Sequence, residues 1–224
     1  MVNAVVEVMA FFLGFAGWVM SAIIITYRFW RVSSMEGNVI TAALVYENLW
    51  MSCATDSTGV HNCSEFPSML GLAGFVQACR ALMIASIVLG TFGLIFTLIG
   101  MQCSKIGGEN YLVKGRIAVL GGVFFILQGM CTMIAVSWYA FNITQEFFDP
   151  LYPGTKFEIG DGLYIGWCSA TLALIAGCCL MCVCGNNSSR EKTPYLYQSQ
   201  HRGTPYTTSV VSQQPNSYNR NAYV

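Results

Sequence analysis

Two cysteines and two carboxylates lie close together in one polar stretch of this 224-residue chain. Cys53 and Cys63 enclose nine residues, and an oxidising compartment would join them in a disulfide. Asp56 lies inside the enclosed segment and Glu65 follows it. Carboxylates that line a narrow passage attract cations, because their field extends over a Debye length of about 8 Å at physiological salt. The alternative is structural: Asp56 would begin a turn and Glu65 would be a solvated surface acid.

The elements that must hold these residues are long apolar segments. Charged residues make up only 10% of the chain, whereas a soluble domain carries about 25%. A helix of roughly 20 apolar residues crosses a bilayer core. Four uncharged stretches qualify as such helices, namely residues 8–25, 81–101, 117–141 and 163–183. The third is long enough that we expect its end, near Trp138 and Tyr139, to protrude from the bilayer.

The charges between these stretches predict the side of the membrane on which each segment lies. The short segment 102–116 and the tail 184–224 together carry seven basic and two acidic residues. The loops 27–80 and 142–162 carry four basic and eight acidic residues. Because basic residues gather on the cytoplasmic side, we expect both termini to be cytoplasmic and both acidic loops to be extracellular. The net charge of zero gives no reason to expect a nucleic-acid partner.

Other cysteines lie at the predicted cytoplasmic ends of the apolar stretches. Three of them are candidates for S-palmitoylation, namely Cys103, Cys182 and Cys184. Cys178 and Cys179, close by, are explained equally well as small packing residues.

The cysteines and histidines of the chain do not form a recognisable catalytic site. Cys179 and Cys182 form a CxxC pair, as in membrane thiol oxidoreductases, but the pair would lie on the reducing side and the outer loop holds no second relay pair. His61 and His201 are the only histidines in the sequence. We therefore predict no enzymatic activity, no cofactor and no metal site.

The loop 27–80 carries the pattern of a small sheet. Residues 29–33 and 39–46 are rich in β-branched, aromatic and apolar types and predict two strands. Residues 56–59 predict a turn between two further strands, which a disulfide between Cys53 and Cys63 would clamp.

An ordered set of residues between the first two apolar stretches resembles the claudin signature W…[GN]LW…C…C…R. It consists of Trp30, Asn48-Leu49-Trp50, Cys53, Cys63 and Arg80. Asn48 stands where the commoner form of the motif has Gly. The resemblance covers the whole chain, and residues 54–57 and 147–154 are most similar to the claudin-15 branch, with the claudin-10 branch as its neighbour.

The resemblance implies a membrane α+β fold, in which a four-helix transmembrane bundle carries a small extracellular antiparallel β-sheet. Four strands would come from the loop 27–80 and the fifth from residues 156–159. Residues 1–183 would form the tetraspan domain. The implied function is a tight-junction strand at the plasma membrane that makes a paracellular cation-selective channel. Asp56 matches the family's pore carboxylate, and Glu65 would line the same wall.

Two alternatives to a channel remain open. Barrier-forming claudins share the backbone and differ in a few loop charges. Auxiliary or adhesion proteins of the peripheral-myelin and calcium-channel gamma type share the four helices and much of the motif.

The resemblance also implies surfaces for assembly. Met69, Phe147 and Phe148 match family positions that join neighbouring chains side by side; alternatively they cap the chain's own extracellular core. Leu49 and Trp50 would anchor the sheet at the bilayer surface. Arg80 would bind loop carbonyls or an acid.

The tail 184–224 is polar and is expected to be disordered, because it has too little apolar surface to fold. Its end, Tyr223-Val224, has the apolar side chain and carboxylate that PDZ domains bind. The expected partners are copies of this chain on the same and on opposing cells, other claudins, PDZ scaffold proteins, membrane lipid and permeating sodium.

Overall fold

The computed structural model describes residues 2–33, 44–55, 59–66, 73–101, 111–151 and 155–190, with the side chains of 2–4, 111–112 and 184–190 left undescribed. All of these residues lie in one compact unit, Met1–Thr193. Asp56, Met69, Cys103, Tyr223 and Val224 lie outside the described residues.

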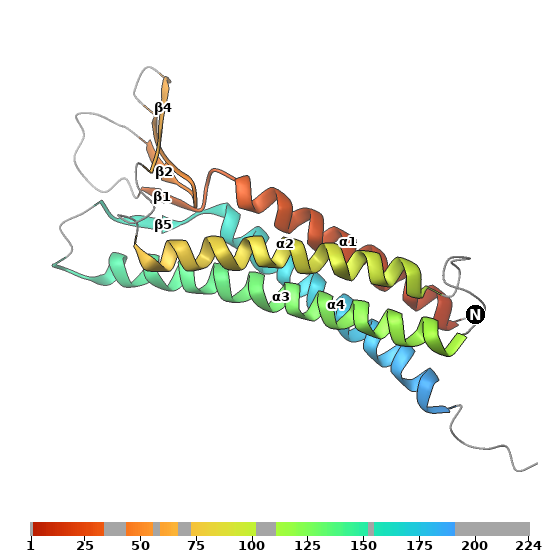
Figure 1. Ribbon diagram of the computed structural model, residues 1–224. Helices are drawn as coiled ribbons and strands as arrows, with labels where there is room; N and C mark the ends of the chain where they lie inside the picture. Colours follow the sequence, from red (N-terminus) through yellow and green to blue (C-terminus); the bar gives the residue numbers. More distant parts are fainter. Residues whose placement is uncertain are drawn as a thin grey trace, which may run out of the picture. The chain divides into compact units, whose positions relative to one another are not determined.

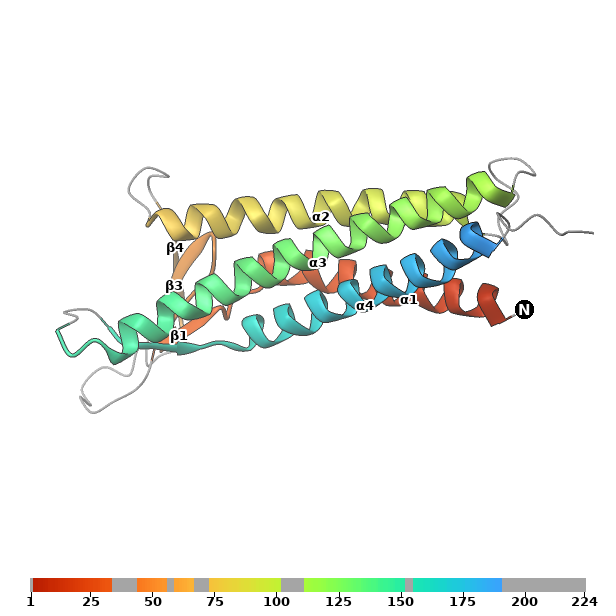
Figure 2. The ribbon, with the colours of Figure 1, turned by 90° about the horizontal axis from the view of Figure 1, so that it is seen from below.

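Four helices form the bundle. They are α1 (Val2–Thr26), α2 (Gly74–Gly100), α3 (Tyr111–Phe148) and α4 (Asp161–Arg190). Each contains a segment long and apolar enough to cross a membrane, so the predicted four-span fold is confirmed. The helices pack as a ring in which α2 contacts α3, α3 contacts α4, and α1 contacts both α4 and α2, as Figures 1 and 2 show.

Every helix extends beyond the apolar stretch that predicted it. The difference is largest in α3, which continues past Trp138 and Tyr139 to Phe148. α4 continues through residues 184–190, the first part of the predicted tail. A helix that has already formed gains one backbone hydrogen bond for each residue added, so polar residues prolong it readily.

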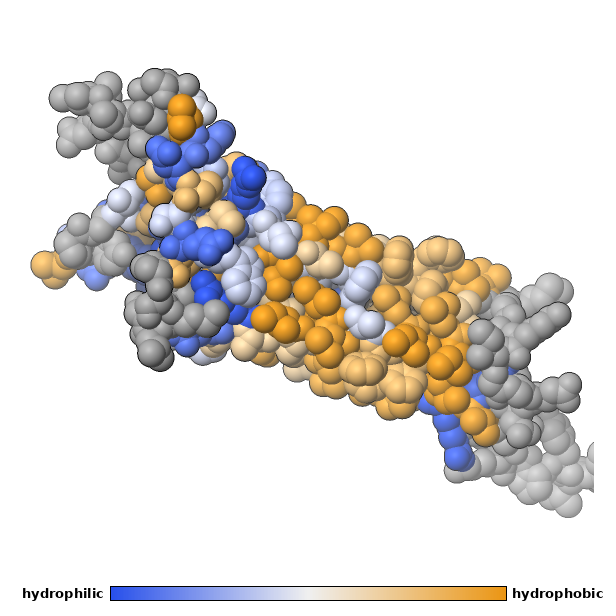
Figure 3. Space-filling view, turned by 45° about the horizontal axis from the view of Figure 1, so that its top comes forward, coloured by the Kyte–Doolittle hydropathy of each residue, from blue (hydrophilic) through white to orange (hydrophobic). Residues whose placement is uncertain are grey.

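Small residues let the helices approach closely. A Cβ added to Gly177 of α4 would lie 2.6 Å from the carbonyl oxygen of Gly122 in α3. Ser21 of α1 and Ser169 of α4 share a buried hydrogen bond of 2.7 Å. Small residues and buried hydroxyls are typical of helix contacts in lipid, where close packing drives association. Large apolar side chains instead cover the outside of the helices (Figure 3).

The sheet has five antiparallel strands in the order β4-β3-β2-β1-β5. They are β1 (Arg31–Ser33), β2 (Leu44–Glu47), β3 (Met51–Thr55), β4 (His61–Glu65) and β5 (Phe157–Ile159). Four come from the loop 27–80 and one from the loop 142–162, as the resemblance implied. Of the strand predicted over 39–46, residues 39–43 lie outside the described residues.

Side chains alternate between the two faces of this sheet. We call one side the core face; it carries Arg31, Val45, Glu47, Phe157 and Ile159. Val45, Phe157 and Ile159 pack in one apolar cluster with Tyr139 and Ile143 of α3. We call the other side the open face; the strand registers place Tyr46, Thr55, His61, Glu65 and Glu158 on it.

Candidate functional site: the sheet and the helix ends beneath it

Two tryptophans join the sheet to the end of α1. The indole Nε1 of Trp30 donates to the carbonyl of Ile24 at 2.9 Å, and that of Trp50 donates to the carbonyl of Ile25 at 2.9 Å. Both carbonyls lie in the last turn of α1, where backbone acceptors have no partner within the helix. The carbonyl of Ile24 also accepts from the backbone N–H of Tyr27, just beyond the helix, at 3.0 Å. The two indoles therefore cap the helix and fix the first strand above it.

Trp30 lies at the centre of the apolar contact between the sheet and the helices. Its side chain is fully buried, and its ring meets that of Tyr139 in α3 edge to face, with centroids 5.1 Å apart. Leu49 is also fully buried in the same cluster. The side chain of Leu49 thus anchors the sheet inside the protein, whereas we expected it to do so at the bilayer surface. Its position reflects the tight β2–β3 turn, which points Leu49 between the helices.

Asn48 shapes the turn between β2 and β3. Its buried side-chain oxygen accepts hydrogen bonds from the backbone N–H groups of Trp50 and Met51, both at 2.8 Å. Asn side chains favour such local hydrogen bonds to the backbone, which close a turn in place of strand pairing. It gives a physical reason for Asn at the position where the commoner motif has Gly.

Arg80 binds this turn from α2. Its buried guanidinium donates through Nε to the carbonyl of Leu49. It also lies 4.8 Å from the ring centre of Trp50 and 5.8 Å from that of Phe66. A loop carbonyl as partner is what the sequence led us to expect. The signature residues Trp30, Asn48, Leu49, Trp50 and Arg80 therefore form one joint between sheet and helices.

Cys53 and Cys63 form the predicted disulfide, which bridges β3 and β4. The two residues are direct partners in the strand register, with Cα atoms 4.1 Å apart. The bridge closes a short hairpin, so its stabilisation lies below the roughly 3 kcal/mol of a fifteen-residue loop. It clamps the end of β3, where Thr55 is the last strand residue before Asp56 in the sequence.

Strand β4 is an edge of the sheet, and all five of its residues are exposed. Glu65 ends this strand opposite Met51. The two ion pairs among the described residues are Arg31–Glu47 and Arg31–Glu146. Among the same residues, no basic group therefore lies within 4.0 Å of the Glu65 carboxylate. Glu65 is therefore available to charges in solution.

Arg31 organises the core face. Its guanidinium pairs with Glu47 of β2 and reaches Glu146 of α3 at 3.4 Å, and it lies 4.5 Å from the ring centre of Phe157. Burial by itself would lower the pKa of Arg31, but Tyr139 and the two carboxylates outweigh it and raise that pKa. The cluster thus holds a permanent cation that ties the end of α3 to the sheet.

Sequence reasoning missed this cluster because its partners are far apart in the chain. Arg31 and Glu146 are separated by 115 residues. The only usable signal was a basic residue in one predicted strand and an acidic residue, Glu47, directly after the next. Their pairing depends on a register that the sequence does not show.

The charges on the strands are sorted by face. The strands carry one arginine and no lysine; Arg31 lies on the core face with Glu47. The open face carries Glu65 and Glu158, both exposed, and no Lys or Arg from any of the five strands. Two of the basic residues between the first and last helices, Arg31 and Arg80, are thus occupied by internal contacts.

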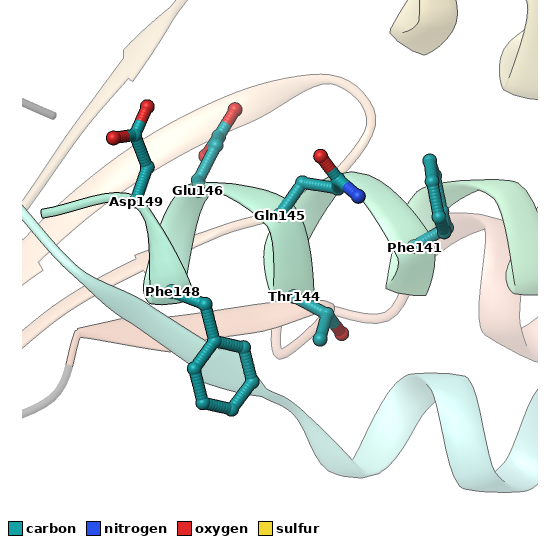
Figure 4. A pocket seen from close by; sticks show the side chains of 6 residues that line it. All are labelled: Phe141, Thr144, Gln145, Glu146, Phe148 and Asp149. Atoms are coloured by element: carbon teal, nitrogen blue, oxygen red, sulfur yellow. The ribbon is translucent and has the colours of Figure 1, made fainter. Parts of the chain in front are cut away.

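Phe147 and Phe148 lie in the last turn of α3. Phe148 is 76% exposed, whereas Phe147 is half-buried and lies 5.6 Å from the ammonium of Lys156. In Figure 4, Phe148 projects from one side of α3 and Glu146 and Asp149 from another. The residues around Phe148 line a shallow open pocket.

The predicted palmitoylation sites lie near the end of α4 or outside the described residues. The thiol of Cys182 is exposed near the end of α4, and the side chain of Cys184 is not described. Among the described residues, no cluster of His, Cys, Asp and Glu could hold a metal ion.

The fold and the joint between sheet and helices together define a class of protein. It is a four-helix membrane protein whose first loop supplies most of a disulfide-clamped sheet. The sequence model of the PMP-22/EMP/MP20/Claudin family matches residues 4–180. Claudin-15 of Bos taurus is 52% identical over 191 residues, which cover 84% of this chain and 80% of that protein. Claudin-10 of Homo sapiens is 44% identical over 235 residues and the full length of both chains. The chain belongs to the claudin family, as its motif predicted.

Proposed function

We propose that this claudin assembles into tight-junction strands and lines a paracellular pathway selective for cations. The observation that carries the proposal is the open face of the sheet, whose strands bear the exposed carboxylates Glu65 and Glu158 and no Lys or Arg. A wall with only negative charges attracts cations and repels anions. Asp56, next to Thr55 on the clamped hairpin, would add a third carboxylate to this wall.

The distribution of basic residues supports an extracellular position for the sheet. Four basic and eight acidic residues belong to the two loops that form it, and seven basic and two acidic residues belong to the segments at the other end. By the positive-inside rule, the sheet faces the intercellular space and both termini face the cytoplasm.

The assembly that we propose uses Phe147 and Phe148. An exposed aromatic ring beside a shallow pocket is suited to receive an apolar side chain from a neighbouring copy. Met69 is our candidate for that side chain. Val224 with its carboxylate would recruit PDZ scaffolds, and lipidation of Cys103, Cys182 and Cys184 would hold the cytoplasmic ends at the membrane. We keep residues 1–183 as the tetraspan domain and 184–224 as the tail.

The test is a charge-selectivity measurement in epithelial cells that lack other claudins. Dilution potentials across monolayers give the permeability ratio of sodium to chloride. Asp56→Asn and Glu65→Gln should both lower this ratio, because each removes a carboxylate from the proposed wall. Glu158→Gln makes the same change to the third carboxylate of the wall, at the opposite edge of the sheet from Glu65, and should lower the ratio less.

The result also separates a channel from the alternatives. A wild-type monolayer with high resistance and no preference for sodium would identify a barrier-forming claudin. An unchanged ratio in both Asp56→Asn and Glu65→Gln would remove these residues from the pathway. Loss of scaffold binding after residues are appended to Val224 would test the tail separately.

A further inference from the structure

His61 occupies a specific place on the open face. It is the first residue of the edge strand β4 and pairs with Thr55, the last residue of β3. Its ring nitrogen Nδ1 lies 2.9 Å from the Thr55 hydroxyl and 3.3 Å from the hydroxyl of Tyr46. The residue is exposed to the surrounding solution.

These contacts suit both charge states of the ring. In the neutral ring with its proton on Nε2, Nδ1 accepts a hydrogen bond from a hydroxyl. In the protonated ring, Nδ1–H donates to the oxygen of Thr55 or Tyr46, because a hydroxyl is both donor and acceptor. Tyr46 is buried, so its hydroxyl needs a hydrogen-bond partner, and Nδ1 of His61 lies 3.3 Å from it. Protonation of His61 therefore changes the charge of the hairpin without breaking its contacts.

The titratable and charged groups around His61 are few. Tyr46 of β2 faces it, and Cys53 of β3 is held in the disulfide. Glu65 lies on the same face of β4, four residues along the strand, or about 13 Å away. Glu47 lies on the core face with Arg31. Asp56 follows Thr55 in the sequence.

We propose that His61 is a specificity-determining residue of the cation pathway, and that its protonation lowers the preference for sodium over chloride. This inference rests on the proposed function. Histidine is the side chain that ordinarily changes charge between about pH 5 and 8. One added positive charge on a wall that bears only carboxylates raises the local potential over a Debye length of about 8 Å. At that range we expect the permeability ratio to fall by about two- to threefold.

The experiment compares dilution potentials at about pH 7.5 and about pH 5.5, on either side of the ordinary imidazole transition. It uses the full chain in monolayers lacking other claudins, with surface labelling to equalise expression. His61→Gln retains a hydrogen-bonding side chain but never gains the charge, so its ratio should change much less with acid. His61→Lys carries a permanent charge, so its ratio should be low at both pH values.

The remaining fall in His61→Gln measures protonation of the carboxylates, and only the difference from wild type belongs to His61. Equal falls in wild type and His61→Gln would overturn the inference and leave the proposed function intact. A high, wild-type-like ratio in His61→Lys at pH 7.5 would overturn it as well. A wild type without sodium preference at pH 7.5 would overturn the proposed function, and this inference with it.

Discussion

The two indole caps at the end of α1 make a sharp prediction, because they bind adjacent carbonyls from environments of different exposure. Trp30→Phe removes the buried N–H that binds Ile24, whose carbonyl then keeps only the backbone N–H of Tyr27 at 3.0 Å. Trp50→Phe removes the same group from Ile25, but the Trp50 side chain is only partly buried and water replaces it. The two substitutions are chemically identical, so each is the control for the other.

The magnitude follows from burial. Because the Ile24 carbonyl keeps the Tyr27 N–H, loss of the Trp30 hydrogen bond costs about 0.5–1.5 kcal/mol. The gap left by the smaller ring at a fully buried site adds about 1 kcal/mol. Loss of a hydrogen bond that water can replace costs about 0.5–1.5 kcal/mol. For a chain of this size, each kcal/mol shifts Tm by about 2–4 °C. We therefore expect Trp30→Phe to lower Tm by roughly 3–10 °C and Trp50→Phe by roughly 1–6 °C.

The assay is the temperature at which the detergent-solubilised protein loses its monodisperse peak in fluorescence-detected size-exclusion chromatography. Trp30→Phe should lower this temperature by more than Trp50→Phe. If Trp50→Phe lowers the transition by as much or more, burial does not set the cost of these caps. If neither substitution shifts it, the indoles do not stabilise the end of α1.

Three further predictions concern the ties within the bundle and sheet. Glu146→Gln should lower Tm by several degrees, because it leaves Arg31 with one carboxylate fewer; Arg31→Gln should lower it further, because both carboxylates then lose their cation. Gly177→Ala should destabilise the α3–α4 contact, since its Cβ would lie 2.6 Å from a backbone oxygen, whereas Gly74→Ala meets nothing within 4 Å and should be neutral in the same melting assay. Cys53→Ser should cost about 2–3 kcal/mol, and a reducing agent should lower the Tm of wild type but not of the variant.

The signature residues and the exposed charged residues of the open face have different roles in this molecule. Trp30, Asn48, Trp50 and Arg80 are all occupied in the joint between sheet and helices, through backbone carbonyls and N–H groups. The presence of these four residues in a sequence therefore indicates the fold. The proposed permeation properties depend instead on exposed side chains of the open face, which can vary without disturbing the joint.

The sequence predicted the elements of this fold well, because each has a local signal. Uninterrupted apolar residues marked the four spans, and paired cysteines in an acidic loop marked the disulfide. The limits of the helices were predicted less well. Polar residues at the ends of α3 continue the helix to Phe148 by backbone hydrogen bonding, which an apolar pattern does not register.

By itself the sequence determined that the chain spans a membrane four times, carries a clamped sheet and belongs with the claudins. Only the tertiary structure decided which charges are free. Arg31, Glu47 and Glu65 look equivalent in the sequence, yet the strand register turns the first two toward α3 and leaves the third exposed. The physical reason is that strand side chains alternate faces, so a shift of one residue in register would exchange the open face and the core face.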